Sequence, residues 1–211
     1  MTHNKIFITL IIIIVCLTIA LLGITLPNKT LNNEKNFSGI YQCEVDNIRA
    51  TCFAIAPNLF ISCCHNFGDN PNEIIFAQNE GNSVSLSVIA RDTSKDLVLL
   101  KCDKQVPNYL CIDTQSIYNN KATAYGNYSG NEIIERDLTI KNQGKDCYLT
   151  TNNRQANVKI LSGNIEFGFS GAPVLNSNNN LLGMISCVNK NNGDIYAISV
   201  SEINNFVEAY K

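Results

Sequence analysis

Short apolar stretches, separated by clusters of turn-forming residues, fill the sequence from residue 40 to residue 200. Apolar runs of about four to eight residues bounded by Gly, Pro, Asn, Asp or Ser are typical of β-strands. The first group is Ile40–Val45, Ala50–Ala56, Leu59–Cys63, Glu73–Ala77, Ser83–Ala90 and Leu97–Cys102. The second group is Ala122–Tyr125, Glu132–Ile140, Cys147–Thr151, Ala156–Leu161, Ala172–Leu175, Leu181–Val188 and Ile195–Val200. The sequence therefore predicts two groups of short strands.

Helical periodicity is convincing only at the end of the chain, over Glu202–Tyr210, where Ser201 is the expected N-cap. The apolar residues on one face of this helix would be Ile203, Phe206, Val207 and Tyr210. No helices alternate with the strands, so an α/β fold is not expected. Two strand groups without intervening helices favour an all-β protein, either two barrels or a sandwich.

The N-terminal segment differs from the rest of the chain. Ile6–Leu26 contains 21 residues without a charge, and a helix of that length spans about 31 Å, roughly one hydrocarbon core. We expect residues 1–27 to form a short cytoplasmic tip and a retained transmembrane anchor that attaches the protein to a membrane. A cleaved signal and a buried core helix are the alternatives, although the apolar region of a signal usually has only about 7–15 residues. With an anchor or a signal, the remaining chain would be exported to an extracytoplasmic location.

Charge and cysteine content limit the partners. Sixteen Lys and Arg oppose eighteen Asp and Glu, and no basic run occurs, so nucleic acid is not an expected partner. Of nine cysteines, eight follow the apolar segment, and one or two disulfides are expected, with Cys102 and Cys111 among the candidates. Neither a metal nor another cofactor is expected. A thiolate-rich zinc site would have to use Cys63, Cys64 and His65.

His65 is the only histidine after residue 3. It directly follows an apolar strand, so a rigid element would hold its imidazole as a catalytic base needs to be held; a structural histidine is the alternative. Asp96 precedes the apolar run Leu97–Leu100. A carboxylate there would be desolvated unless a donor pairs with it. An imidazole N–H or a turn amide could be that donor.

Ser170 lies between two glycines in Gly168–Leu175, directly before a predicted strand. Glycines allow a tight turn, leave the hydroxyl accessible and let successive N–H groups face the group that the serine attacks. A serine hydroxyl needs a base to become a nucleophile, and an imidazole needs a partner that fixes its tautomer. His65, Asp96 and Ser170 fit these roles.

These segments resemble conserved blocks of the trypsin-like (chymotrypsin-fold) serine proteases, and are closer to bacterial and organellar members than to digestive enzymes. The matching segments are Thr51–Pro57 and Leu59–His65 (similar to G-x-G-F-x-I-A-P and L-x-x-T-A-A-H), Asp96–Leu100 (D-[IL]-A-L-L), Ala124–Gly130 (A-x-G-x-P-x-G), Gly168–Val174 (G-x-S-G-G-P-V), Leu182–Ser186 and Tyr196–Ser199. The resemblance implies two six-stranded antiparallel β-barrels and a short C-terminal helix. The barrels would occupy residues 39–115 and 116–211, after a linker at residues 28–38.

The resemblance also implies roles for individual residues. His65 would be general base and then general acid, Asp96 its orienting carboxylate, and Ser170 the nucleophile. The N–H groups of Gly168 and Ser170 would form the oxyanion hole. The implied substrate-binding residues are Asn164, near the base of the primary pocket, and Ser186, Cys187 and Val188 along one side of it. The Ser186 hydroxyl could also donate to Asp96.

Several positions depart from the family pattern. Phe169 stands where digestive members carry an Asp that pairs with a newly cut N-terminus, so activation by that ion pair is not expected. Cys63 and Cys64 replace Ala-Ala, Ala172 replaces a Gly, and no Cys follows the histidine. Asn164 carries no negative charge, so a preference for small, apolar or uncharged polar substrate side chains is expected.

The predicted function is a membrane-tethered serine endopeptidase that acts on proteins or peptides through an acyl-enzyme. One alternative is an inactive trypsin-like domain that binds protein partners. Another is a hydrolase or redox protein that depends on Cys63 or Cys64. A Cys64–His65 dyad is awkward because adjacent residues of a strand point to opposite faces.

Overall fold

The computed structural model describes residues 38–45, 48–68, 74–79, 81–112, 119–127, 132–142, 146–151 and 154–210. All of them belong to one unit, Asn36–Lys211. The expected anchor, most of the linker at 28–38 and the expected boundary between residues 115 and 116 lie outside the described residues. Within the described part of the chain, no helix has the length and apolar character needed to cross a membrane.

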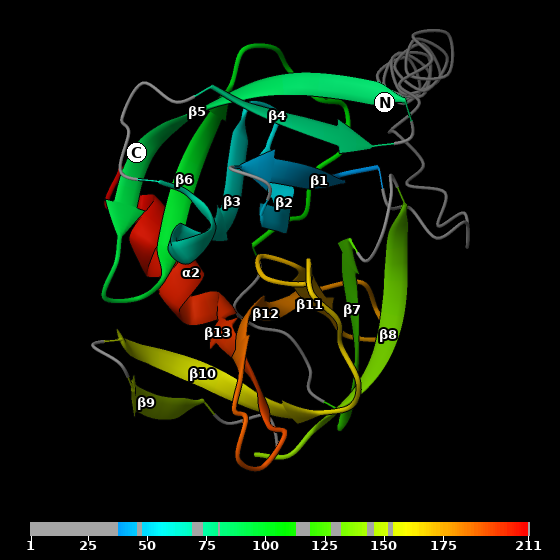
Figure 1. Ribbon diagram of the computed structural model, residues 1–211, viewed down its shortest axis with the longest axis vertical. Coiled ribbons are helices and arrows are strands. Elements are labelled where there is room, and N and C mark those ends of the chain that lie inside the picture. Colours follow the sequence, from blue (N-terminus) through cyan, green and yellow to red (C-terminus); the bar gives the residue numbers. More distant parts are fainter. Residues whose placement is uncertain are drawn as a thin grey trace, which may run out of the picture. The chain divides into compact units, whose positions relative to one another are not determined.

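The first lobe is a closed barrel of six antiparallel strands (Figure 1). Its strands are β1 (Ile40–Val45), β2 (Ile48–Ala56), β3 (Leu59–Cys63), β4 (Ile74–Asn79), β5 (Asn82–Asp92) and β6 (Leu97–Cys102). They follow the order β1-β2-β3-β6-β5-β4, and β1 closes the barrel by pairing with β4, with Gln42 opposite Gln78. Along β4 every second residue is buried, as expected for a strand with one face toward a core. The predicted six-stranded barrel is confirmed for this lobe.

The second lobe is a seven-stranded antiparallel sheet. Its strands are β7 (Lys121–Asn127), β8 (Ile133–Ile140), β9 (Cys147–Thr151), β10 (Arg154–Ser162), β11 (Pro173–Leu175), β12 (Leu181–Val188) and β13 (Ile195–Ser199). The order is β13-β12-β11-β7-β8-β10-β9, and β13 also pairs with β10. Six strands therefore form a ring, and β9, which the sequence predicts as the strand Cys147–Thr151, lies outside the six-stranded barrel that the resemblance implies. It fits because β10 is long enough to pair with β9 along residues 154–158 and with β8 at residues 161–162.

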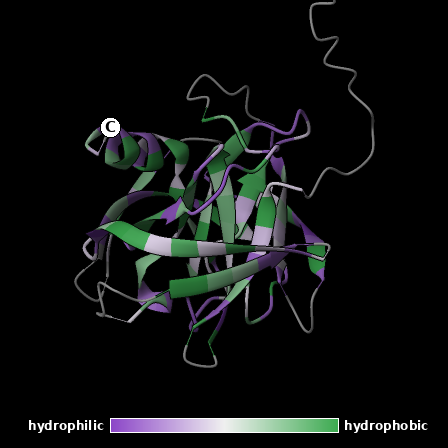
Figure 2. Ribbon diagram, turned by 90° about the horizontal axis from the view of Figure 1, so that it is seen from above, coloured by the Kyte–Doolittle hydropathy of each residue, from purple (hydrophilic) through white to green (hydrophobic). Residues whose placement is uncertain are grey.

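Apolar and polar residues alternate along individual strands, as the hydropathy colours of Figure 2 show. One apolar cluster joins the two lobes. It includes Phe53, Ile61 and Leu97 of the first lobe, Met184 and Ile198 of the second, and Ile203 and Phe206 of the C-terminal helix. Removing this apolar surface from water favours a fixed arrangement of the lobes. Loops from both lobes can therefore form one site.

The C-terminal helix α2 spans Val200–Glu208. Its N-cap is Ser199, whose hydroxyl accepts a hydrogen bond from the N–H of Glu202 at 3.4 Å. The predicted cap, Ser201, is therefore wrong by two residues, because Ser201 lies in the first helical turn. Three of the four predicted face residues, Ile203, Phe206 and Val207, are buried. Tyr210 follows the helix and is 53% exposed.

Replacing Ser199 with alanine is expected to lower the free energy of unfolding by about 1 kcal/mol, since an N-cap hydroxyl of this kind typically contributes that much. Denaturation by urea would measure the change. The matched control is Ser201→Ala, which removes a hydroxyl two residues away and should cost less. An equal or larger loss in the control would contradict the assignment of Ser199 as the cap.

The eight cysteines of the described residues are free thiols. The predicted disulfides, with Cys102 and Cys111 among the candidates, are therefore wrong for these residues. Cys102 is buried, whereas Cys111 is exposed, so the two side chains occupy different environments. Burial raises the pKa of Cys52 and of Cys102. These thiols remain neutral and pack as small apolar side chains.

Candidate active site

His65 lies in a short 3₁₀ turn, Cys64–Asn66, that directly follows β3. The N–H of Cys64 donates to the carbonyl oxygen of Asp96 at 3.1 Å, which fixes the start of the turn. The side chain of His65 is 33% exposed. One edge of the imidazole therefore contacts the protein while the other can meet a substrate.

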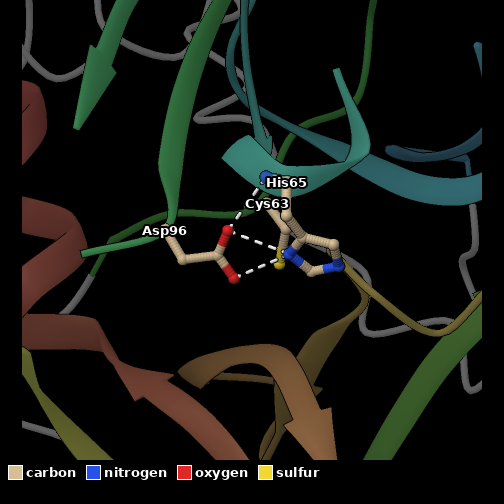
Figure 3. A group of neighbouring side chains, drawn as sticks. All are labelled: Cys63, His65 and Asp96. Carbon is tan, nitrogen blue, oxygen red and sulfur yellow. Dashed lines mark hydrogen bonds and ion pairs between the residues drawn. The ribbon is translucent and has the colours of Figure 1, made fainter. Parts of the chain in front are cut away.

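Asp96 lies directly before β6 and is only 2% exposed. Its Oδ1 accepts from the main-chain N–H of His65 at 3.0 Å, and the imidazole Nδ1 lies 2.9 and 2.8 Å from the two carboxylate oxygens (Figure 3). The hydroxyl of Ser186 donates to Oδ2 at 2.5 Å. A buried carboxylate needs such donors. The imidazole and a turn amide both supply them, and the predicted bond from Ser186 is present.

The turn that carries Asp96 is held at several points. Asp96 has a φ of 61°, in the left-handed region that Asp tolerates better than most residues. Asp92 Oδ1 accepts from the Ser94 hydroxyl at 2.6 Å and from the Lys95 N–H at 3.0 Å. Lys95 Nζ pairs with Glu202 of α2 at 2.9 Å, and this hydrogen bond raises the pKa of Lys95. The position of Asp96 thus depends on both β5 and the helix.

Ser170 lies in the second lobe, between β10 and β11, and its Oγ is 3.2 Å from His65 Nε2. The carbonyl oxygen of Ser170 accepts from the N–H of Thr51 at 2.9 Å and from Asn66 Nδ2 at 3.3 Å. Both donors belong to the first lobe. The structure therefore brings a carboxylate, an imidazole and a hydroxyl into one hydrogen-bonded row, although the sequence places them far apart.

The two glycines beside Ser170 adopt conformations that favour glycine. Gly168 has a φ of 100° and Gly171 a φ of 87°. A Cβ atom on Gly168 would lie 2.2 Å from the carbonyl oxygen of Asn127, and one on Gly171 would lie 2.0 Å from that of Thr51. Such distances are far inside van der Waals contact. Gly171 therefore permits the close approach of this loop to β2 of the first lobe, and Gly168 permits its close approach to the end of β7 in the second lobe.

The N–H groups of Gly168 and Ser170 are the predicted oxyanion donors. Among the described residues, neither N–H has a hydrogen-bond acceptor. Phe169, between them, is fully buried, and its own N–H donates to the carbonyl oxygen of Glu166 at 3.3 Å. Two available N–H groups beside a serine hydroxyl can bind an oxygen on which negative charge develops.

The predicted substrate-binding residues lie in two segments. Ser186, Cys187 and Val188 end β12, where the pairing with β13 is irregular. Ser186 is buried, Cys187 is half-buried and Val188 is exposed. Asn164 is exposed between β10 and β11. Their assignment to a primary pocket remains a prediction.

One group of side chains has donor atoms that could hold a metal ion. Cys63 Sγ, a His65 ring nitrogen and an Asp96 oxygen lie within 4.8 Å of one another (Figure 3). Thiolate, imidazole and carboxylate are all zinc ligands. Each atom is already engaged, however, because Cys63 Sγ donates to the carbonyl oxygen of Ile185 at 3.1 Å and the imidazole pairs with the carboxylate. A metal there would replace the bonds that orient His65.

Residues 168–171, which carry Ser170, are called the nucleophile loop below. Two residues that contact this loop were given no role in the sequence analysis. Asn66 donates to the Ser170 carbonyl, and the Thr51 hydroxyl donates to the Gly168 carbonyl at 2.7 Å. Both are buried. A polar residue inside the apolar stretch Ala50–Ala56 was the only local signal for Thr51.

A family model for trypsin-like peptidase domains matches residues 50–184, a range that includes His65, Asp96 and Ser170. The chain therefore belongs to the trypsin-like peptidase family. It is a trypsin-like serine protease, a hydrolase. Among curated protein sequences, none matches this chain.

Solved structures of bacterial proteases share the fold. The inactive form of the Rv3671c protease of M. tuberculosis has a TM-score of 0.69 at 15% identity, over 80% of this chain and 86% of that one. The MamO protease domain of Magnetospirillum magneticum has a TM-score of 0.66 at 16% identity, over 80% and 95%. A serine endoprotease of Yersinia pestis has a TM-score of 0.65 at 16% identity, over 82% of this chain and 62% of that chain. These low identities show a shared fold alone.

Proposed function

We propose that the protein is an endopeptidase that cleaves peptide bonds in proteins or peptides through an acyl-enzyme, with His65, Asp96 and Ser170 as its catalytic triad. The observation that supports this most strongly is the continuous row of hydrogen bonds from Ser186 through Asp96 and His65 to Ser170 Oγ. Such a row can move a proton from the nucleophile and stabilise the charge that results.

In acylation, Ser170 Oγ attacks the carbonyl carbon of the scissile bond while His65 Nε2 takes the hydroxyl proton. The Nδ1–H of the imidazolium stays hydrogen-bonded to Asp96, whose negative charge stabilises it. The carbonyl oxygen becomes negative and accepts from the N–H groups of Gly168 and Ser170. Nε2 then donates its proton to the leaving amine, the C–N bond breaks and an ester on Ser170 remains.

In deacylation, a water molecule attacks the ester carbon and His65 Nε2 takes a proton from it. The same nitrogen returns a proton to Ser170 Oγ as the ester bond breaks and the acid product leaves. His65 therefore alternates between base and acid, and the enzyme returns to its starting state.

The active loop conformation does not need an N-terminal ion pair in this proposal. Phe169 is fully buried at the position where digestive members carry an Asp. Its ring occupies the space beside Gly126, where an added Cβ would lie only 2.8 Å from ring carbons. We propose that this apolar packing replaces the ion pair in holding residues 168–170.

For specificity, we propose small, apolar or uncharged polar side chains on the acyl side of the scissile bond. Asn164 supplies no negative charge, and the nearby carboxylate of Glu166 is paired with Arg136 Nη2 at 2.5 Å. A cleavage profile on a peptide library would test this proposal. Predominant cleavage after Arg or Lys would contradict it.

We also propose that residues 6–26 anchor the protein in a membrane and that the protease domain is extracytoplasmic. The uncharged length of this segment supports the proposal. Extraction of membranes with alkaline carbonate, together with N-terminal sequencing, would distinguish a retained anchor from a cleaved signal. A protein found only in the soluble fraction with its original N-terminus would contradict both.

The test of the endopeptidase is hydrolysis of fluorescein-labelled casein and its inhibition by a fluorophosphonate. We expect the wild-type protein to release fluorescent peptides and the reagent to stop the release. A folded protein that neither cleaves casein nor reacts with the fluorophosphonate would favour the alternative of an inactive trypsin-like domain that binds protein partners.

A further inference from the structure

Thr51 is a fully buried polar residue of β2 that contacts the second lobe through its main chain and its side chain. Its N–H donates to the Ser170 carbonyl oxygen at 2.9 Å, and its hydroxyl donates to the Gly168 carbonyl oxygen at 2.7 Å. The same hydroxyl accepts from the N–H of Asn127, at the end of β7, at 3.0 Å. The Thr51 hydroxyl thus links β2, β7 and the nucleophile loop.

These bonds act on the backbone of the loop at two points. Gly168 has no side chain and a φ of 100°, so its own sterics impose little restriction on the orientation of the peptide that joins it to Phe169. The Thr51 hydroxyl restricts that peptide by holding its carbonyl oxygen inside the protein. A peptide that rotated away would leave the buried hydroxyl of Thr51 without an acceptor, which is unfavourable.

The orientation of this peptide matters for chemistry. Oxyanion stabilisation requires N–H groups that are already oriented before charge develops on the substrate oxygen. A carbonyl oxygen turned toward the substrate would instead repel that charge. A residue that fixes the loop should therefore affect the transition state more than the binding of substrate.

We infer that Thr51 is a positioning residue for hydrolysis, whose hydroxyl holds the Gly168–Phe169 peptide in the orientation that leaves the N–H groups of Gly168 and Ser170 available to the substrate carbonyl oxygen. The inference rests on the proposed function. Thr51 acts through the loop and makes no contact with the reacting atoms.

The test compares Thr51→Val, which keeps the shape but removes the hydroxyl, with Thr51→Ser, which keeps the hydroxyl. With p-nitrophenyl acetate as substrate, we expect Thr51→Val to lower kcat about 10- to 100-fold, less than the roughly 10²–10³ that loss of an oxyanion donor costs. KM and the pH profile of the rate should stay close to wild type, because His65 and Asp96 are untouched. Thr51→Ser should retain kcat within about threefold.

Ser199→Ala is the control for a general loss of stability, since it removes a buried hydroxyl at the helix cap and should leave kcat unchanged. Wild-type kcat in a folded Thr51→Val variant would overturn the inference, as would a Thr51→Ser variant that loses activity as strongly as Thr51→Val. If Thr51→Val does not fold, a folded Thr51→Ser variant with kcat below one-tenth of wild type would also overturn it. Failure of the proposed function is a different result, namely a wild-type protein that does not hydrolyse the ester.

Discussion

Replacing Ser170 with alanine is expected to lower kcat for peptide hydrolysis about 10⁶-fold, the loss seen when the nucleophile of a serine protease triad is removed. Without the hydroxyl no acyl-enzyme can form, so only stabilisation by the oxyanion donors and substrate binding remain. Cleavage of labelled casein by the purified variant would measure the effect. The fold should be preserved, because both main-chain contacts of the loop to Thr51 involve carbonyl oxygens and not the Ser170 side chain.

The matched control is Ser177→Ala, which removes an exposed serine hydroxyl in the turn before β12. It should retain wild-type activity. A second comparison adds His65→Ala to Ser170→Ala. Because nucleophile and base act as one unit, the double variant should be no less active than the single one. Additive losses would mean that His65 and Ser170 do not cooperate.

Replacing Asp96 with asparagine is expected to lower kcat about 10⁴-fold, since an amide in place of the carboxylate favours the wrong imidazole tautomer and does not stabilise the imidazolium. The effect depends on the two short contacts from His65 Nδ1 to the carboxylate, at 2.8 and 2.9 Å. Steady-state hydrolysis of casein or of a peptide selected from the library would measure it. Circular dichroism would show whether the variant keeps its β structure.

Asp103→Asn is the control for this variant, because Asp103 is exposed and lies just beyond the other end of β6. It makes the same chemical change beside the opposite end of the same strand and should leave kcat unchanged. A folded Asp96→Asn variant with more than one-tenth of wild-type kcat would show that the carboxylate is not the partner of a catalytic base.

The strands, and the meeting of His65, Asp96 and Ser170 in space, could be predicted because their signals are local. Apolar stretches between turn residues define strands, and His65, Asp96 and Ser170 each lie next to such a stretch, with glycines marking the last of them. The fold brings the ends of these strands together, so the three side chains lie in one site. The helix cap was missed because Ser199 and Ser201 are both acceptable caps, and periodicity does not fix a helix end to within two residues.

What depends on distant contacts could not be predicted. The Thr51 hydroxyl contacts residues 76 and 117 positions away in sequence, and a threonine in a strand carries no local sign of such partners. The state of the cysteines depends on which thiols come close in space, and eight cysteines allow many pairings. The place of β9 outside the ring of the second lobe likewise depends on how β10 is shared between two neighbours.

The most direct test of the triad is to locate the adduct that a fluorophosphonate forms with the native protein, by proteolytic digestion and mass spectrometry. The geometry predicts one labelled residue, Ser170, in the wild-type protein and no labelling in a folded His65→Ala variant. Labelling at another serine, or a folded wild-type protein that takes up no reagent, would contradict the assignment of Ser170 as an activated nucleophile.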